Sequence, residues 1–81
     1  MNAIEARALL ARLLHQIAPE VDLASVPPDA LLQEELGLDS MDFLNLVTAL
    51  HEETQISVPE RDYPKLATVE GFVAYVCAAA G

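Results

Sequence analysis

Basic residues, cysteine and aromatic residues are scarce in this chain of 81 residues. It has four Lys and Arg together, one Cys, no Trp, two Phe and two Tyr. Thirteen acidic residues outweigh the four basic ones and give a formal net charge of −9. A field of that sign repels phosphate backbones, which argues against nucleic-acid binding, and it attracts partners with basic patches.

A single cysteine, Cys77, leaves no pair for an intramolecular disulfide. This fits a reducing compartment, so we expect a cytoplasmic protein in which Cys77 packs as a small apolar residue. No apolar run approaches the roughly 20 residues that cross a bilayer, and the first residues lack the pattern of a signal peptide. We expect neither a membrane span nor a leader.

The 53% hydrophobic content is enough for one domain with a modest core, which we take to span residues 1–81. Three stretches have helical spacing. The first should begin after Asn2, because Asn2 and Glu5 have the N-cap and N3 spacing of a capping box, and it should end before Pro19. Its apolar stripe consists of Ala6, Leu9, Leu10, Leu13, Leu14 and Ile17.

The second helix should run from about residue 40 to 54, with Asp39 as N-cap and Asp42 at the third helical position. Thr68 is a good N-cap for a last helix through about residue 79. Gly71 should cost that helix roughly 1 kcal/mol relative to alanine. The residues that we expect this helix to bury are Val69, Phe72, Val73 and Val76.

Two connections separate these helices. Residues 19–39 form a long one, which we take as a loop pinned across the core, with a short helical turn possible near 29–35. Pro59 and Pro64 bracket a segment in which residues 60–63 should form one irregular turn at most. The fold class predicted is therefore all-α: a small bundle of three main helices and a fourth short one.

The second helix carries more apolar residues than its core face needs. Phe43, Leu46, Val47 and Leu50 make the core stripe when the helix is projected at about 100° per residue. Met41 and Leu44 lie well away from that stripe, among polar and acidic neighbours. Such a strip suggests a docking surface.

Ser40, in the run LGLDSMDFLNL at residues 36–46, allows two interpretations. Ser40 or Asp39 can simply cap the helix, which explains the pattern by itself. Alternatively, a phosphoryl group attached to Ser40 would meet the unpaired N–H groups and the positive end of the helix dipole. Spacing alone does not decide between them.

The chain resembles the acyl carrier protein family over nearly its whole length. The core of the likeness is Leu36-Gly37-Leu38-Asp39-Ser40-Met41, and it continues through Val58-Pro59 and Leu66-Ala67-Thr68-Val69. The resemblance implies that Ser40 bears 4′-phosphopantetheine, transferred from coenzyme A by a phosphopantetheinyl transferase. It also implies a carrier without catalysis of its own, which takes acyl thioesters from a loading enzyme to downstream enzymes with basic docking patches. These enzymes would belong to a fatty-acid, polyketide or specialised acyl or aminoacyl pathway. The positions that match the family's docking face are Asp39, Met41, Asp42, Leu44, Thr48, Glu52 and Glu53.

Departures from the fatty-acid-synthesis pattern point to a specialised pathway. Asn45 and His51 stand where such carriers commonly have acids, and Asp39, rather than His, argues mildly against the peptidyl carriers. Bulky residues at positions that often line the acyl cavity suggest short, polar or aminoacyl cargo. The positions that we consider for this cavity are Phe43, Val47, Leu50, Val58, Tyr63, Leu66 and Phe72.

Three other functions compete with the carrier. A hydrolase at Ser40 lacks the Gly-x-Ser-x-Gly elbow, and His51 should lie about 16 Å along the same helix. No calcium-loop pattern or other metal site is predicted. The serious alternative is an unmodified helical adaptor that binds partners through Met41 and Leu44. We expect a monomer, because an arm that swings needs room.

Overall fold

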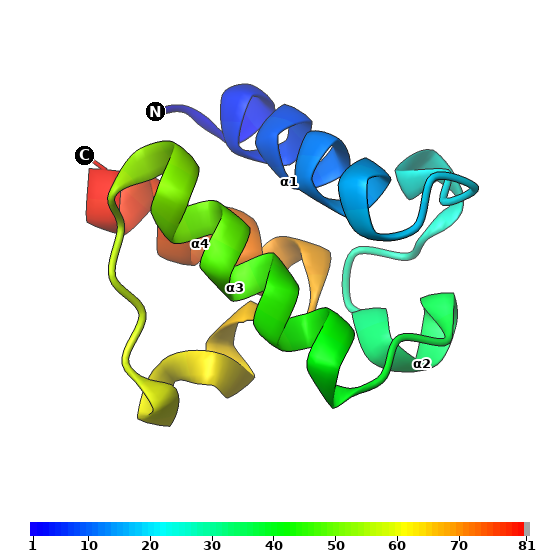
Figure 1. Cartoon of the computed structure of the whole chain (residues 1–81). Coiled ribbons are helices and arrows are strands. Elements are labelled where there is room, and N and C mark those ends of the chain that lie inside the picture. The colour runs from blue at the N-terminus through cyan, green and yellow to red at the C-terminus, as the bar shows by residue number, and fades with distance from the viewer. Residues whose placement is uncertain (81) are drawn as a thin grey trace.

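Four α-helices and two 3₁₀-helices make up the computed structural model, which describes residues 1–80. In chain order they are α1 (Ala3–Ile17), η1 (Leu23–Ser25), α2 (Leu32–Leu36), α3 (Ser40–Thr54), η2 (Glu60–Leu66) and α4 (Val69–Ala80). α1 packs on both α3 and α4, and η2 packs on α4 (Figure 1). The all-α bundle of three long helices and one short one is therefore confirmed.

Leucine-rich stripes from the three long helices meet in one core. Leu10, Leu13 and Leu14 of α1 are fully buried, as are Leu46 and Leu50 of α3. No polar or charged residue is buried among the residues that the structure describes. Each buried leucine contributes about 1.5–3 kcal/mol through the removal of apolar surface from water. The core thus depends on hydrophobic burial.

The capping box expected at Asn2 and Glu5 is present, and Asp39, expected as an N-cap, forms a second one with Asp42. At the start of α1 the Glu5 backbone N–H donates to the Asn2 side chain at 2.8 Å, and the Asn2 N–H donates back to the Glu5 carboxylate at 3.0 Å. Asp39 and Asp42 make the same reciprocal pair at the start of α3. These pairs satisfy N–H groups that a helix start leaves without partners, so they fix where each helix begins.

The connection over residues 19–39 is more structured than a pinned loop. It contains η1 and α2, and α2 ends at Gly37, whose φ of 66° lies in the left-handed region. The Leu32 N–H donates to the Ala67 carbonyl at 2.8 Å, and the Glu70 N–H donates to the Pro28 carbonyl at 3.0 Å. These bonds fasten the connection to the start of α4, which allows a five-residue helix that would be unstable alone.

The expectation of one irregular turn over residues 60–63 was wrong, because η2 continues through Leu66 with Pro64 inside it. A 3₁₀-helix has φ near −50 to −70°, which matches the φ of about −65° that a proline ring imposes. Asp62 and Ala67 donate N–H bonds to the carbonyls of Pro59 and Pro64 at 2.8 and 3.3 Å. Pro64 therefore suits the interior of η2, and Pro59 precedes the helix as its N-cap.

Two expectations for α4 also need correction. Val73 is only partly buried, unlike Val69, Phe72 and Val76. Gly71 is more than a small penalty on the helix, because a Cβ there would lie 2.3 Å from the Lys65 carbonyl oxygen. Its lack of a side chain lets η2 approach α4 closely. Thr68 does cap α4, since its hydroxyl oxygen accepts the Gly71 N–H at 3.0 Å.

Candidate functional site

Ser40 is the first residue of α3 and is exposed to solvent. The N-cap is Asp39, whose carboxylate accepts the Asp42 backbone N–H at 2.8 Å. Within residues 1–80 no hydrogen bond to the Ser40 hydroxyl is found. The cap is thus complete without the serine, and its hydroxyl is available for chemistry.

The backbone N–H groups near Ser40 favour a phosphodiester there, whereas the neighbouring carboxylates oppose it. α3 has fifteen residues, and the backbone N–H groups of Ser40 and Met41 precede the first bond of its helical ladder, which runs from the Phe43 N–H to the Asp39 carbonyl. Free N–H groups and the positive dipole end attract anions. The Asp39 and Asp42 carboxylates oppose this attraction, but they are bound to backbone N–H groups of the capping box.

A cleft of about 370 Å³ opens directly beside Ser40. Its walls come from α3, η2 and α2, and the rings of Phe43 and Tyr63 meet in it edge to face, with centroids 5.8 Å apart. Most of the lining is apolar. The residues that line the cleft are Gln33, Ser40, Phe43, Leu44, Glu60, Tyr63, Pro64 and Ala67.

Of the seven cavity positions expected from the sequence, only Phe43 and Tyr63 line this cleft. Val58 is partly buried elsewhere against the core, and the remaining four, Val47, Leu50, Leu66 and Phe72, are buried in the core. Sequence reasoning missed Gln33 and Glu60, because α2 and η2 bring them to Ser40 and neither helix was predicted at its full extent.

The strip on α3 is exposed as predicted. Met41 and Leu44 are 64% and 41% exposed, large fractions for apolar side chains. Asn45, Thr48 and Glu52 are exposed beside them. We call these five residues the α3 strip. A surface of this kind, apolar with a polar edge, is typical of protein contacts.

Three of the four acidic residues expected on the docking face already have a partner within the chain. The Asp39 carboxylate accepts the Asp42 N–H in the capping box. Asp42 is partly buried and its carboxylate accepts the Asp39 N–H. Glu53 binds the guanidinium of Arg12 on α1, so that its charge is compensated. Asp39 and Glu52 are exposed, and no ion pair to either is found in the described part of the chain.

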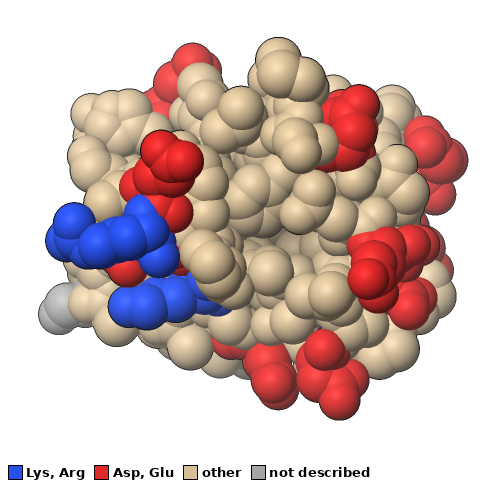
Figure 2. Space-filling view, turned by 90° about the horizontal axis from the view of Figure 1, so that it is seen from below, with Lys and Arg blue, Asp and Glu red and all other residues tan. Residues whose placement is uncertain are grey.

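Acidic side chains are distributed unevenly around the Ser40 end of the molecule. Figure 2 shows the end that holds α2, η2 and the start of α3 in Figure 1. Acidic groups stand around most of its rim, basic groups gather at one edge, and the middle is a broad area without charged side chains (Figure 2). On most sides of this face, negative charge therefore surrounds an area without charged side chains (Figure 2).

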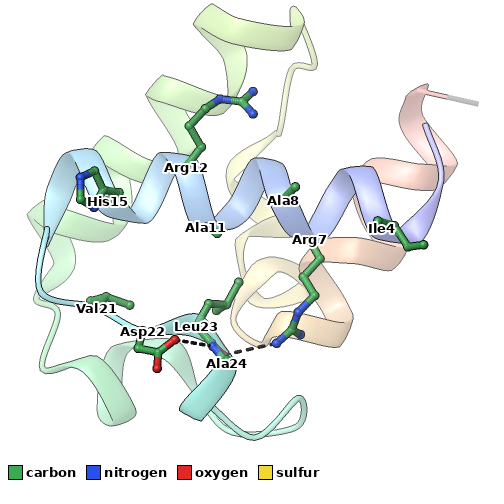
Figure 3. Close-up of a pocket in the computed structure, with 10 residues that line it drawn as sticks. All are labelled: Ile4, Arg7, Ala8, Ala11, Arg12, His15, Val21, Asp22, Leu23 and Ala24. Carbon is green, nitrogen blue, oxygen red and sulfur yellow. Dashed lines mark hydrogen bonds between the residues drawn. The ribbon is translucent and has the colours of Figure 1, made fainter.

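A larger hollow, of about 650 Å³, lies apart from Ser40 between α1 and the residues around η1 (Figure 3). Ile4, Ala8 and Ala11 line it on the α1 side. The Arg7 guanidinium donates to the Leu23 carbonyl at 3.4 Å across it, and the Asp22 carboxylate accepts the Ala24 N–H (Figure 3). The Arg7 bond therefore fastens the long connection to α1, whereas the Asp22 bond caps η1 within the connection.

Neither histidine lines the cleft beside Ser40. His51 lies in the last turn of α3, where its Nδ1 is 3.3 Å from the Ile56 carbonyl oxygen, while Ser40 is the first residue of that helix. His15 borders the hollow on α1 (Figure 3). Both are exposed, as expected. Among residues 1–80 no three or more His, Cys, Asp or Glu side chains form a group that could hold a metal ion.

No helix in the described residues is long and apolar enough to span a bilayer.

A comparison with known protein families adds the identity of the domain. A family model described as a phosphopantetheine attachment site matches residues 5–76, which is most of the chain. The prosthetic group of this family is 4′-phosphopantetheine, and its members are carrier domains. The chain therefore belongs to the phosphopantetheine-attachment family and is a carrier domain of the acyl carrier protein type.

Proposed function

We propose that Ser40 is the attachment residue and that the protein carries acyl groups between enzymes as a non-catalytic cosubstrate. The observation that supports this most directly is the exposed Ser40 hydroxyl, which is unbonded among the described residues while Asp39 caps α3. When bound, phosphopantetheine supplies a thiol that holds cargo as a thioester. The tether gives cargo a high effective concentration at a docked enzyme, so the carrier itself need not bind it tightly.

Attachment requires a separate phosphopantetheinyl transferase and coenzyme A. The Ser40 oxygen forms a bond to the phosphorus that bears the pantetheine, and the phosphoanhydride bond of coenzyme A breaks. Adenosine 3′,5′-bisphosphate leaves, and the hydroxyl proton passes to a base of the transferase. The carrier contributes an accessible hydroxyl at a rigid position, because the capping box fixes the start of α3.

Partner enzymes are expected to dock on the α3 strip next to Ser40. Met41 and Leu44 supply its apolar contacts, and the exposed carboxylates of Asp39 and Glu52 steer basic patches toward it. Asn45 and His51 reduce the charge of this helix relative to the fatty-acid-synthesis pattern. This favours a specialised pathway over primary fatty-acid synthesis. We further propose that the protein acts as a cytoplasmic monomer.

The deciding experiment offers the purified chain coenzyme A and a broad-specificity phosphopantetheinyl transferase, and measures the intact mass. A carrier gains the mass of one phosphopantetheinyl group, and Ser40→Ala abolishes the gain. Ser25→Ala and Ser57→Ala are matched controls, because both serines are exposed and lie outside α3. An unchanged mass for the native chain would favour the adaptor that uses Met41 and Leu44 without modification.

A further inference from the structure

The cleft beside Ser40 is lined by the Phe43–Tyr63 ring pair. We propose, on the basis of the function proposed above, that it receives short neutral or amine-bearing acyl groups and that the Phe43–Tyr63 pair bars longer chains from the core. Ser40 itself lines this cleft, so an arm attached there can fold back and place its thioester in it. A volume of about 370 Å³ lies at the small end of the range for ligand pockets, roughly 300–1,000 Å³.

The aromatic pair forms the inner limit of the cleft. Phe43 is 8% exposed and meets Tyr63 at an interplanar angle of 66°. Leu46, Leu50 and Leu66 are fully buried and do not line the cleft. A long chain would therefore have to separate the two rings and then displace close-packed side chains, both of which are unfavourable.

The Tyr63 side of the barrier is held firmly in place. η2, which carries Tyr63, is bound to α4 by a hydrogen bond of 2.8 Å from the Tyr75 hydroxyl to the Asp62 carboxylate. Gly71 allows the backbone of η2 to lie directly against α4. Movement of Tyr63 away from Phe43 would strain both contacts, so the cleft should not widen readily.

The charge of the cleft gives a second basis for selecting among acyl cargoes. Glu60 is the only charged residue that lines it, and no ion pair to Glu60 is found among residues 1–80. A cargo that ends in a carboxylate would meet like charge there, in a chain of net charge −9. A neutral cargo meets no such repulsion, and an ammonium group is attracted. The Gln33 amide adds a hydrogen-bonding group to the lining.

Acyl-coenzyme A substrates and the transferase allow a direct test on the intact chain. The native protein is loaded with propionyl, β-alanyl, malonyl or dodecanoyl cargo, and intact mass verifies each product. NMR of labelled methyl and amide groups then reports where the cargo lies. We expect propionyl and β-alanyl to shift the Gln33 and Tyr63 amide signals relative to the protein that carries phosphopantetheine without an acyl group. Dodecanoyl should leave the Leu46 and Leu50 methyl signals and the melting temperature unchanged.

Variants locate the barrier and the charge. Tyr63→Ala and the milder Phe43→Leu should let dodecanoyl shift the Leu46 and Leu50 methyl signals and raise the melting temperature. Ile17→Ala, which trims a partly buried residue on α1, should not. Malonyl should leave the cleft signals unshifted in the native chain and shift them in Glu60→Gln.

The outcomes separate the two proposals. A loaded native carrier in which dodecanoyl shifts the core signals, or in which no short cargo shifts the cleft signals, would overturn the cleft inference and leave the attachment at Ser40 intact. The cleft inference also fails if Tyr63→Ala and Phe43→Leu remain folded and dodecanoyl still does not shift the Leu46 and Leu50 methyl signals. Absence of the mass gain at Ser40 would overturn both proposals.

Discussion

The Tyr75 hydroxyl donates a 2.8 Å hydrogen bond to the Asp62 carboxylate and so ties η2 to α4. The Lys65 Nζ lies 3.4 Å from Oδ1, the other oxygen of the same carboxylate. The bond from Tyr75 lowers the pKa of Asp62 below its ordinary value of 3.8. Desolvation opposes this shift, and the contact with Lys65 adds to it. In return, donation to Asp62 and partial burial raise the pKa of Tyr75 above 10.0. The carboxylate and the neutral phenol are therefore the forms that the fold prefers.

The first prediction concerns the pH range of this contact. Because the pKa of Asp62 is lower in the folded state, its contribution is present above pH 3.8 and lost as the pH falls through the folded pKa. Because the pKa of Tyr75 is raised, its contribution is present below pH 10.0 and lost as the pH rises through the folded value. Tyr75→Phe should lower the urea midpoint at neutral pH, with a smaller effect in acid and in alkali. An effect of equal size at pH 3 and pH 7 would contradict this.

The second prediction concerns Gly71. By helix propensity alone, Gly71→Ala should stabilise α4 by about 1 kcal/mol. The new Cβ would lie 2.3 Å from the Lys65 carbonyl oxygen and 2.9 Å from the Thr68 hydroxyl oxygen. Overpacking of this kind costs about 1–3 kcal/mol, so we expect net destabilisation in urea unfolding. Ala74→Gly, at an exposed position of the same helix, should show only the propensity loss. A more stable Gly71→Ala protein would refute the close approach of η2.

Local rules were sufficient to predict the long helices. The capping pairs Asn2–Glu5 and Asp39–Asp42 and the apolar period of 3.6 residues are encoded within a few positions of one another, so α1 and α3 begin where expected. α2 and η2 depend instead on distant partners. The bond from Leu32 to Ala67 joins residues 35 positions apart in sequence (67 − 32), which no local pattern reveals.

The same distinction holds for the site. Ser40, Met41 and Leu44 lie on one helix, so their order and exposure follow from its period. The cleft brings α2 and η2 to α3, and Gln33 and Glu60 could not be assigned to it without the tertiary structure. Gly71 was misjudged for a related reason, because its neighbour is the backbone of η2 rather than a residue of its own helix.

The third prediction separates capping from attachment. Asp39→Ala removes the side-chain acceptor of the Asp42 N–H and should cost about 1 kcal/mol in the free energy of unfolding, whereas Asp39→Asn keeps an acceptor and should cost less. Ser40→Ala removes a hydroxyl without a hydrogen bond in the described chain and should change stability by no more than about 0.5 kcal/mol. Urea unfolding measures all three. A large loss in Ser40→Ala would assign the hydroxyl a structural role instead.

The fourth prediction concerns the docking of partner enzymes on the α3 strip. Leu44→Ser and Met41→Ser replace exposed apolar side chains, so they should leave the urea midpoint nearly unchanged. Both should slow the transfer of phosphopantetheine to Ser40, because a few well-packed side chains near the centre of an interface carry most of its affinity. Glu52→Gln should slow the transfer chiefly at low salt, where exposed charges steer association most strongly.

Glu53→Gln is the matched control for Glu52→Gln, since both remove one carboxylate from the same end of α3. The Glu53 carboxylate already binds Arg12, so its loss should alter the transfer rate less than the loss of Glu52. Exposed ion pairs contribute about 0–1 kcal/mol, and the variant should therefore stay folded. Initial rates at two salt concentrations, followed by intact mass, provide the measurement. Equal losses from Glu52→Gln and Glu53→Gln would mean that net charge, rather than the α3 strip, controls docking.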